Sequence, residues 1–299
     1  MHRTSAPLTR LAVAAVALLA ALAATLTLAT RAEAVVGGRP ATHTSWPSLV
    51  ALLDSRVADA FDAQFCAGTL IGRRHVLTAA HCVEGRRRFV PARTLDVATN
   101  ATALGRVRAR DRVRVSRVVP YPERRPRGAV DRGHDLAILE LSRPVRRTPA
   151  ALASAPVDAV RRERGRIAGW GATDELGEVP SDRLRAGRVR VTAPEVCDEF
   201  GAPWGTVCAT IPESREPSAC SGDSGGPLLR TRAGRAEVVG IVSIGPDYCG
   251  RGVTTAFTDV STYRAWIEHV VRGGQASATL ASLGGPTHGA PVSASLAVR

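Results

Sequence analysis

The sequence predicts an all-β fold, and three observations support this prediction. Short segments that are continuously apolar or that alternate apolar with polar residues, such as 49–52, 75–78 and 136–141, are typical of strands. Helices and strands do not alternate regularly along the chain, as they would in a parallel α/β fold. Between a leader and a tail lie about 240 residues, a length that all-β proteins reach as one domain.

The start of the chain, residues 1–34, has the pattern of an export signal. Arg3 and Arg10 come before an apolar run over 11–29, and an Ala-Glu-Ala motif ends at Ala34. A basic start, an apolar centre and a small-residue cleavage motif are typical of a secretory signal peptide. The run is also long enough to span a bilayer, but it stops at the cleavage motif. We therefore predict a signal peptide over 1–34 and a secreted protein without a stable membrane anchor.

The composition agrees with export. All 40 basic residues are arginine, against 27 acidic residues, so the formal net charge is +13. A lysine-free chain rich in arginine and alanine indicates a GC-rich bacterial genome, and we predict an actinobacterial source. The six cysteines form an even set, which predicts disulfides in an exported protein.

The first predicted strands lead to a histidine. A strand with alternating burial is expected over 49–52, after Trp46, which we interpret as a packing residue. Residues 69–71 and 75–78 flank a turn and predict a hairpin that delivers His81 to its end.

Residues 105–115 show a regular arginine pattern. Arginine occupies every second position, at Arg106, Arg108, Arg110, Arg112 and Arg114. A strand would place all five on one face, opposite a valine face. Such a ridge would suit a polyanion such as DNA or an anionic cell-wall polymer, but we favour an ordinary solvated strand face in an arginine-rich protein.

Later segments predict one more buried strand and a tail. Asp135 stands directly before an apolar run that ends at Leu141 and reads as a buried strand. Residues 273–299 are rich in glycine, alanine, serine and proline, so we predict a disordered tail there.

A glycine-rich turn carries the candidate nucleophile. Ser224 lies within Gly-Asp-Ser-Gly-Gly-Pro, residues 222–227, where glycines permit a tight turn and let backbone N–H groups converge on one point. His81 and Asp135 lie upstream, so the chain order is His, Asp, Ser. This order differs from those of subtilisin and of the α/β-hydrolases.

These motifs, together with Val-Val-Gly-Gly at 35–38 and Gly-Trp-Gly at 169–171, resemble the trypsin/chymotrypsin family of serine proteases. The resemblance covers about Val35 to Arg272 and implies a protease domain over 35–272. The fold it implies is two packed six-stranded antiparallel β-barrels, followed by a C-terminal helix near 263–268.

The resemblance implies a secreted serine endopeptidase that works through an acyl-enzyme. Ser224 is the expected nucleophile, His81 the general base, and Asp135 the residue that orients the imidazole. The backbone N–H groups of Gly222 and Ser224 are expected to form the oxyanion hole. No cofactor and no metal are expected. Relatives carry a calcium-binding loop in the segment that corresponds to residues 94–110, but here this segment contains a single carboxylate, that of Asp96.

The resemblance also places a specificity pocket. Ser218 falls at its floor, Gly245 at its mouth and Thr255 in its interior, while the strand Ser243-Ile244-Gly245 is expected to pair with the substrate backbone. A neutral floor offers no partner to a buried Arg or Lys, so we predict cleavage after medium or large apolar residues. Arg251 near the rim makes an acidic preference the second choice.

The resemblance further implies three disulfides and an activation contact. The expected pairs are Cys66 with Cys82, Cys197 with Cys208, and Cys220 with Cys249. The new amine of Val35 is expected to pair with Asp223 and to hold the oxyanion loop in shape. Because Ala34 ends the signal-peptidase motif, a single cut would both release and activate the protein.

Two other functions were weighed against an active endopeptidase. A non-catalytic polyanion-binding protein on a protease scaffold usually lacks a triad residue, and this chain lacks none. An esterase of the α/β-hydrolase type disagrees with the order of the triad. We expect a monomer that acts on protein or peptide substrates and is open to control by protein inhibitors.

Overall fold

The computed structural model describes residues 35–124, 133–157, 163–192, 194–199, 201–203, 205–209, 217–245, 248–250, 253–275, 277 and 283. The predicted signal peptide, most of the predicted tail, and Arg251 lie outside these ranges. All described residues belong to the unit Glu33–Arg299. Within them, no helix has both the length and the apolar character needed to cross a membrane.

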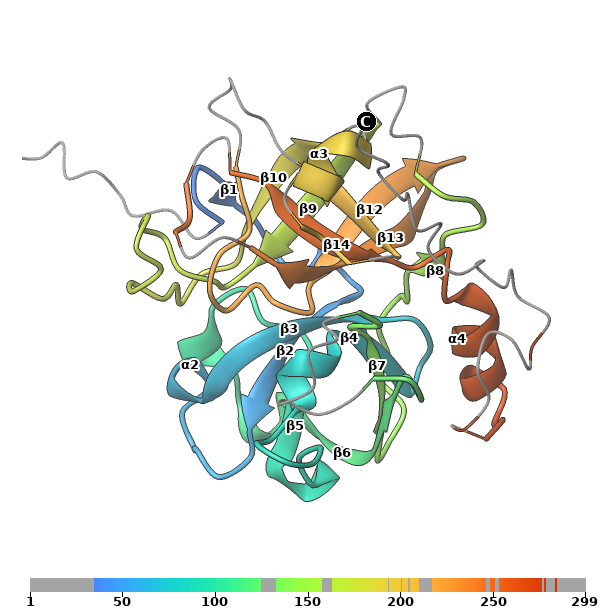
Figure 1. The fold of residues 1–299 in the computed structure, drawn as a ribbon. Coiled ribbons are helices and arrows are strands. Elements are labelled where there is room, and N and C mark those ends of the chain that lie inside the picture. The colour runs from blue at the N-terminus through green and yellow to red at the C-terminus, as the bar shows by residue number, and fades with distance from the viewer. Residues whose placement is uncertain are drawn as a thin grey trace, which may run out of the picture. The chain divides into compact units, whose positions relative to one another are not determined.

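The first half of this unit is a closed antiparallel barrel (Figure 1). Its six strands pair in the order β2-β3-β4-β7-β6-β5. Their bounds are β2 (Leu49–Asp54), β3 (Gln64–Leu70), β4 (His75–Thr78), β5 (Leu95–Ala98), β6 (Arg112–Pro120) and β7 (Ala137–Leu141). The predicted hairpin is confirmed, because β3 and β4 pair through Thr69 opposite Leu77.

The first strand differs from its prediction. Alternating burial was expected over 49–52, but all of Leu49–Leu53 is buried. The inner face of β2 lines the barrel, and its other face packs toward the second half of the unit, where β2 contacts β9 (Arg164–Gly169). A strand covered on both faces has a continuous apolar pattern.

The solvated strand face expected over 105–115 is wrong for the first part of this segment. Residues Leu104–Arg106 and Ala109–Asp111 form the 3₁₀ helices η3 and η4, and β6 starts only at Arg112. Contacts from distant segments fix this shape, because the Asp182 carboxylate accepts from Gly105 N at 2.7 Å. Arg112 does not face solvent with the others, since its guanidinium pairs with Asp96 at 3.2 Å.

The second half is an eight-stranded, curled sheet (Figure 1). Seven strands follow the order β1-β10-β9-β12-β13-β14-β11, and β8 pairs with β13 in parallel. Their bounds are β1 (Arg39–Pro40), β8 (Ala151–Leu152), β9 (Arg164–Gly169), β10 (Arg185–Arg190), β11 (Thr206–Ala209), β12 (Pro227–Arg232), β13 (Arg235–Ile244) and β14 (Thr255–Asp259). The predicted all-β class is confirmed, with a closed barrel and a curled sheet as its two halves.

The helices among the described residues are short. Besides η3 and η4, they are α2 (Ala60–Ala63), α3 (Pro194–Glu199), α4 (Arg264–Val271), and the 3₁₀ helices η1 (Ala80–Val83) and η2 (Ala92–Thr94). The predicted C-terminal helix is α4, which buries Trp266, Ile267 and Val270 along one side. Its outer side carries the Arg264–Glu268 ion pair at 2.6 Å.

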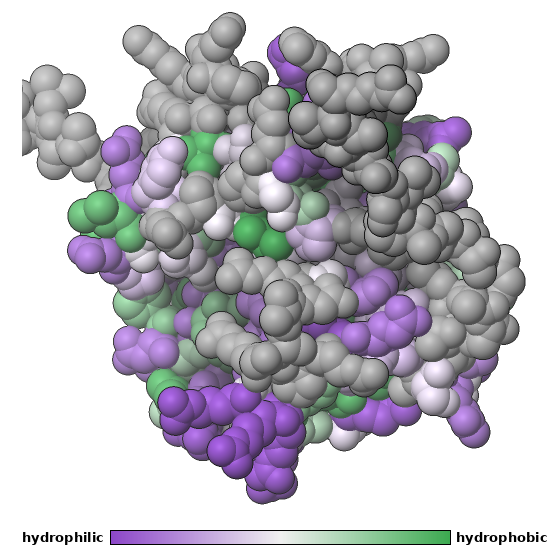
Figure 2. Space-filling view, in the orientation of Figure 1, coloured by the Kyte–Doolittle hydropathy of each residue, from purple (hydrophilic) through white to green (hydrophobic). Residues whose placement is uncertain are grey.

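Apolar side chains from both halves join in one core cluster. Barrel residues such as Leu52 and Leu139 belong to the same cluster as Trp170 and Ile241 of the second half. On the face drawn in Figure 2, a continuous purple, hydrophilic area lies at the end of the barrel, below the labels β5 and β6 of Figure 1. The shared core therefore fixes the loops that both halves send to the candidate site.

Candidate active site

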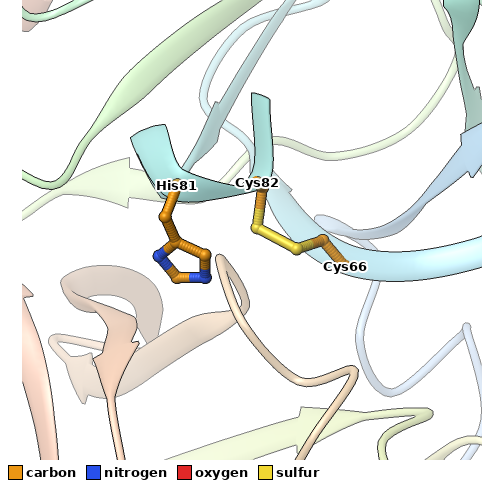
Figure 3. Close-up of side chains that lie close together, drawn as sticks. All are labelled: Cys66, His81 and Cys82. Atoms are coloured by element: carbon orange, nitrogen blue, oxygen red, sulfur yellow. A yellow bond between two sulfur atoms is a disulfide. The ribbon is translucent and has the colours of Figure 1, made fainter. Parts of the chain in front are cut away.

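His81 lies on η1, directly after the β3–β4 hairpin. Cys82 is the next residue on the same turn, and its disulfide to Cys66 on β3 anchors this turn to the barrel (Figure 3). A disulfide that closes a loop of this size contributes about 3 kcal/mol in the chain-entropy model. The histidine is thus carried by a short, cross-linked segment.

Asp135 holds the histidine from the start of the segment that leads into β7. Its Oδ2 accepts from His81 Nδ1–H at 2.7 Å, and its Oδ1 accepts from His81 N at 2.9 Å. The Ser243 hydroxyl donates to the same Oδ2 at 2.6 Å. The Thr258 hydroxyl donates to the Asp135 carbonyl oxygen at 2.9 Å. These bonds fix both the carboxylate and the ring that it orients.

The charges of this pair support each other. Burial lowers the pKa of His81, but the charge and hydrogen bond of Asp135 outweigh it and raise the pKa of His81 above 6.5. Burial raises the pKa of Asp135, and the opposing effects of His81, Arg124 and Ser243 lower it below its usual value. The Asp135 carboxylate therefore stays negatively charged and can stabilise the protonated imidazole of His81.

A buried ion pair lies behind the Asp135 carboxylate. Arg124, at the end of the segment after β6, pairs with Glu84 at 2.5 Å, and only 1% of the Glu84 side chain is exposed. The other end of the guanidinium lies 3.8 Å from Asp135 Oδ1 and donates to the Gly133 carbonyl at 2.9 Å. Arg124 favours the low pKa of Asp135 and opposes the raised pKa of His81.

Ser224 lies on a turn that is held by both halves of the unit. Ala67 N on β3 donates to the Ser224 carbonyl at 2.8 Å, and Gly225 N donates to the Val242 carbonyl on β13 at 2.8 Å. A Cβ on Gly225 would lie 2.2 Å from Thr78 Oγ1, so this turn packs directly against the segment that leads into His81. Gly222 and Gly225 have φ values of 94° and 77°, which glycine adopts without strain.

Two backbone N–H groups of the serine turn have no protein acceptor among the described residues. Asp223 N, Gly225 N and Gly226 N each donate to a carbonyl. In the part of the chain that the structure describes, Gly222 N and Ser224 N donate to no protein acceptor. Free donors at a tight turn can bind a developing oxyanion. Among the described residues, the Ser224 hydroxyl and His81 share no hydrogen bond. In free enzymes the distance between such a nucleophile and its base is often long, and it shortens when substrate binds.

Asp223 is a deeply buried carboxylate. Only 1% of it is exposed, and its two oxygens accept from Gly171 N at 2.9 Å and Cys220 N at 3.0 Å. No cation pairs with it among the described residues. Burial outweighs these two bonds and raises its pKa to about 6. The site therefore contains an uncompensated carboxylate directly before the serine.

Val35 is placed in the core of the second half. It is 1% exposed and clusters with Ile167, Val189 and Leu228. The next residue, Val36, forms an antiparallel bridge with Ser218, whose N–H donates to the Val36 carbonyl at 3.2 Å. The segment that begins at Val35 therefore runs alongside the predicted specificity residue.

The three predicted specificity residues have different environments. Ser218 is buried, and its hydroxyl accepts from Gly250 N at 3.4 Å. Thr255 is buried at the start of β14. Gly245 follows the end of β13, and a Cβ there would meet no atom within 4 Å. Ile244 ends β13 opposite Ala256, so the segment expected to pair with substrate begins on β13 and continues past its end to Gly245.

The remaining cysteines are joined as pairs. Cys197 on α3 bonds Cys208 on β11, and Cys220 bonds Cys249. Cys66, His81 and Cys82 lie close enough together to suggest a metal site, since their ligand atoms lie within 4.8 Å of one another. Both sulfurs are used in the disulfide, and it is the free thiolate that binds metals, so this cluster does not provide a metal centre while the disulfide is intact.

Sequence reasoning missed four contributors to the site. Ser243 was assigned only to the substrate-pairing strand, whereas its hydroxyl also bonds Asp135. No role at the site was predicted for Thr258, Arg124 or Glu84, although Thr258 and Arg124 lie against Asp135 and Glu84 pairs with Arg124. No local motif identifies them, because each lies far along the chain from Asp135 or is an ordinary charged residue.

The comparisons with known proteins agree with this geometry. The sequence profile named "Trypsin" matches residues 35–267. The chain is 33% identical over 243 residues to "Serine protease SP24D" of Anopheles gambiae, covering 80% of this chain and 81% of that protein. It is 34% identical over 210 residues to "Chymotrypsin" of Phaedon cochleariae, covering 68% and 71%. It is 32% identical over 249 residues to "Kallikrein-14" of Homo sapiens, covering 80% and 84%.

All three of these relatives are animal proteins. They do not support the bacterial source that the lysine-free composition predicts.

Proposed function

The chain belongs to the trypsin family of serine proteases, and from this premise we propose that His81, Asp135 and Ser224 are its catalytic triad. It is a serine-type endopeptidase that acts on protein substrates. The observation that carries the proposal is the Asp135–His81 hydrogen bond of 2.7 Å. The turn that carries Ser224 lies beside this pair, because Gly225 packs against Thr78 and Ala79, which lead into His81.

In the proposed reaction, Ser224 Oγ attacks the peptide carbonyl carbon while His81 Nε2 accepts the hydroxyl proton. His81 then gives this proton to the leaving amine, which breaks the peptide bond and leaves an acyl-enzyme. Water next attacks the ester with the same base, which releases the acid and restores Ser224. Asp135 holds the imidazole with Nδ1–H toward its carboxylate and stabilises the imidazolium.

The free N–H groups of Gly222 and Ser224 are the proposed oxyanion hole. They donate to no protein acceptor among the described residues, so they need not break a bond to receive the carbonyl oxygen. Loss of one such donor in other serine proteases costs about 3 kcal/mol of transition-state stabilisation.

We also propose that the Val35 amine activates the enzyme by pairing with Asp223. The carboxylate is buried without a cationic partner among the described residues, and the Val35 side chain is buried in the same half of the unit. Cleavage after Ala34 would create this amine. The three disulfides are consistent with secretion, which would expose this bond to signal peptidase.

For specificity, we propose cleavage after medium or large apolar residues. Ser218 is neutral and buried, so an Arg or Lys side chain reaching it would find no charge partner there. Gly245 leaves open space where a side chain would stand, and Thr255 narrows the interior. An acidic preference supported by Arg251 is the second choice, and that residue lies outside the described ranges.

Catalysis is tested by hydrolysis kinetics of single variants of the active chain. Ser224→Ala and His81→Ala should each lower kcat by about 10⁵–10⁶-fold, because triad residues act as a unit. Thr192→Ala is the control and should keep kcat. It removes a hydroxyl that donates to the Cys208 carbonyl and not to a residue of the proposed triad. Full turnover by Ser224→Ala would refute the assignment.

Specificity is tested with a set of peptide anilides that differ only in the residue before the cleaved bond. Apolar anilides should be cleaved and the Arg anilide should not. Ser218→Asp should gain cleavage of the Arg anilide, because it supplies the missing carboxylate. Efficient cleavage of the Arg anilide by the parent chain, with apolar anilides ignored, would overturn this proposal.

A further inference from the structure

Five arginines share one face of three neighbouring strands in the second half of the unit. On β9 and β10, Arg166 lies directly opposite Arg188, and Arg164 directly opposite Arg190. Residues two apart on a strand point to the same side, so these four side chains share a face. The alternate positions on these strands point to the other side, where Val189 and Ile167 are buried in the core.

Arg39 on β1 extends this face. It lies opposite Ala186, which is two residues before Arg188 on β10 and therefore points to the same side. We call this set the arginine face (Arg39, Arg164, Arg166, Arg188 and Arg190). It is separate from the predicted ridge over 105–115, which the structure breaks into two 3₁₀ helices and a strand.

No acidic partner neutralises the arginine face within the described part of the chain. Among the described residues, none of its five guanidinium groups forms an ion pair or a hydrogen bond. Other sheet arginines do: Arg230 on the adjacent strand β12 pairs with Glu237 at 2.8 Å and Glu163 at 3.5 Å. Like charges directly opposite each other on neighbouring strands are destabilising. The face therefore carries a cost to stability that a bound anion would remove.

A groove runs beside this face. Its volume is about 640 Å³, and Arg39, Arg166 and Arg188 contribute to its lining together with Trp46 and Pro217. Among the residues that the structure describes, no acidic side chain lines it. The Arg166 guanidinium lies 5.0 Å from the centre of the Trp46 ring, a cation–π contact that holds this arginine in place. The groove is therefore concave, positively charged and partly preorganised.

We propose that the arginine face and its groove bind a linear sulfated polysaccharide. Guanidinium forks suit tetrahedral oxyanions, and side chains two apart on a strand repeat at about 6.6 Å, which allows several contacts to one extended chain. Single-stranded nucleic acids are usually held by stacking bases on exposed aromatic rings. Trp46 is 3% exposed and covered by Arg166, so it offers no such platform.

The proposal is tested with heparin as the probe, by titration of the full active chain at 50–200 mM NaCl. The test variant is Arg164→Gln/Arg188→Gln/Arg190→Gln, which keeps the arginine that stacks on Trp46. The matched control is Arg106→Gln/Arg108→Gln/Arg110→Gln, which removes the same charge from exposed positions on the barrel.

The test variant should bind heparin about 30-fold more weakly at 150 mM NaCl, and its slope of log affinity against log salt should fall by about 3. The control should stay within about threefold of the parent. Hydrolysis of a small anilide should be unchanged in both, which shows that they fold and that the result is independent of the proposed catalysis. The test variant should also melt about 1–4 °C higher, because repulsion between facing arginines is relieved. Should the triple variant fail to fold, Arg188→Gln/Arg190→Gln serves in its place.

Three outcomes would overturn the proposal. Equal weakening in both triple variants would show an effect of net charge alone. No measurable heparin binding by the parent would remove the ligand. Tighter binding of single- or double-stranded DNA of the same charge, lost in the test variant, would assign the face to nucleic acid.

Discussion

Asp223 gives a prediction that links activation to stability. The change is Asp223→Asn, made in a chain that keeps Glu33 and Ala34 before Val35 and therefore lacks the Val35 amine. In this uncut chain the Asp223 carboxylate is buried, and only backbone N–H groups contact it among the described residues. Ser224→Ala is added to every protein to prevent self-digestion.

The size of the effect follows from the pKa of Asp223. Burial raises it from 3.8 to about 6. Since one pKa unit corresponds to about 1.4 kcal/mol, the difference corresponds to about 3 kcal/mol. Below pH 3.8 both folded and unfolded chains carry the proton. Between pH 3.8 and about 6 only the unfolded chain loses it, so the free energy of unfolding falls as pH rises and levels off above about 6.

The assay is urea unfolding followed by tryptophan fluorescence between pH 4 and 7.5. The uncut parent should lose about 3 kcal/mol of stability across this range through Asp223, and Asp223→Asn should lack this component. Other titrating groups are present in both proteins and cancel in the difference. A third protein that begins at Val35 should lose much less, because the amine lowers the pKa of Asp223.

Identical pH dependence in the parent and Asp223→Asn would refute the burial argument. Identical pH dependence in the uncut chain and the chain that begins at Val35 would refute the proposed pairing, even if burial is correct.

The surroundings of His81 and the Gly225 turn give further predictions. The kcat/KM of the active chain should rise with pH through a midpoint above 6.5, because Asp135 raises the pKa of His81. Arg124 lowers and Glu84 raises the pKa of His81, so Arg124→Gln should move this midpoint up and Glu84→Gln should move it down. The double variant should lie near the parent. The pH profiles of all four proteins check this, and shifts of both single variants in the same direction would contradict it. Gly225→Ala should lower kcat at least tenfold, because its Cβ would lie 2.2 Å from a neighbouring hydroxyl oxygen at a φ of 77°. Gly234→Ala, at a φ of 75° with no atom within 4 Å, is the matched control and should cost only about 1–2 kcal/mol of stability with normal kcat.

Local patterns predicted the parts of the fold that depend on neighbouring residues. The hairpin before His81 and the strand after Asp135 need only short apolar segments and a turn, and both are present. Alternation failed over 105–115, because Asp182, far along the chain, binds Gly105 N and favours a 3₁₀ turn over a strand. Periodicity within a segment cannot report a bond from a distant one.

The same limit applies to the candidate site. The motifs around His81 and Ser224 are local and could be found in the sequence. The contacts of Asp135 with Arg124 and Ser243 depend on how β6, β7 and β13 meet, which no motif contains. The arginine face was missed for the same reason. Arg164 and Arg190 become neighbours only through the register of β9 and β10, which is not written in either strand alone.

The central claim is that Ser224 is the nucleophile of an active endopeptidase. The most direct measurement is reaction of the chain beginning at Val35 with a fluorophosphonate, followed by peptide mapping in a mass spectrometer. We expect one equivalent of label, attached to Ser224, with hydrolysis lost in proportion to labelling. Label on a different residue, or full hydrolysis after complete labelling of Ser224, would contradict it.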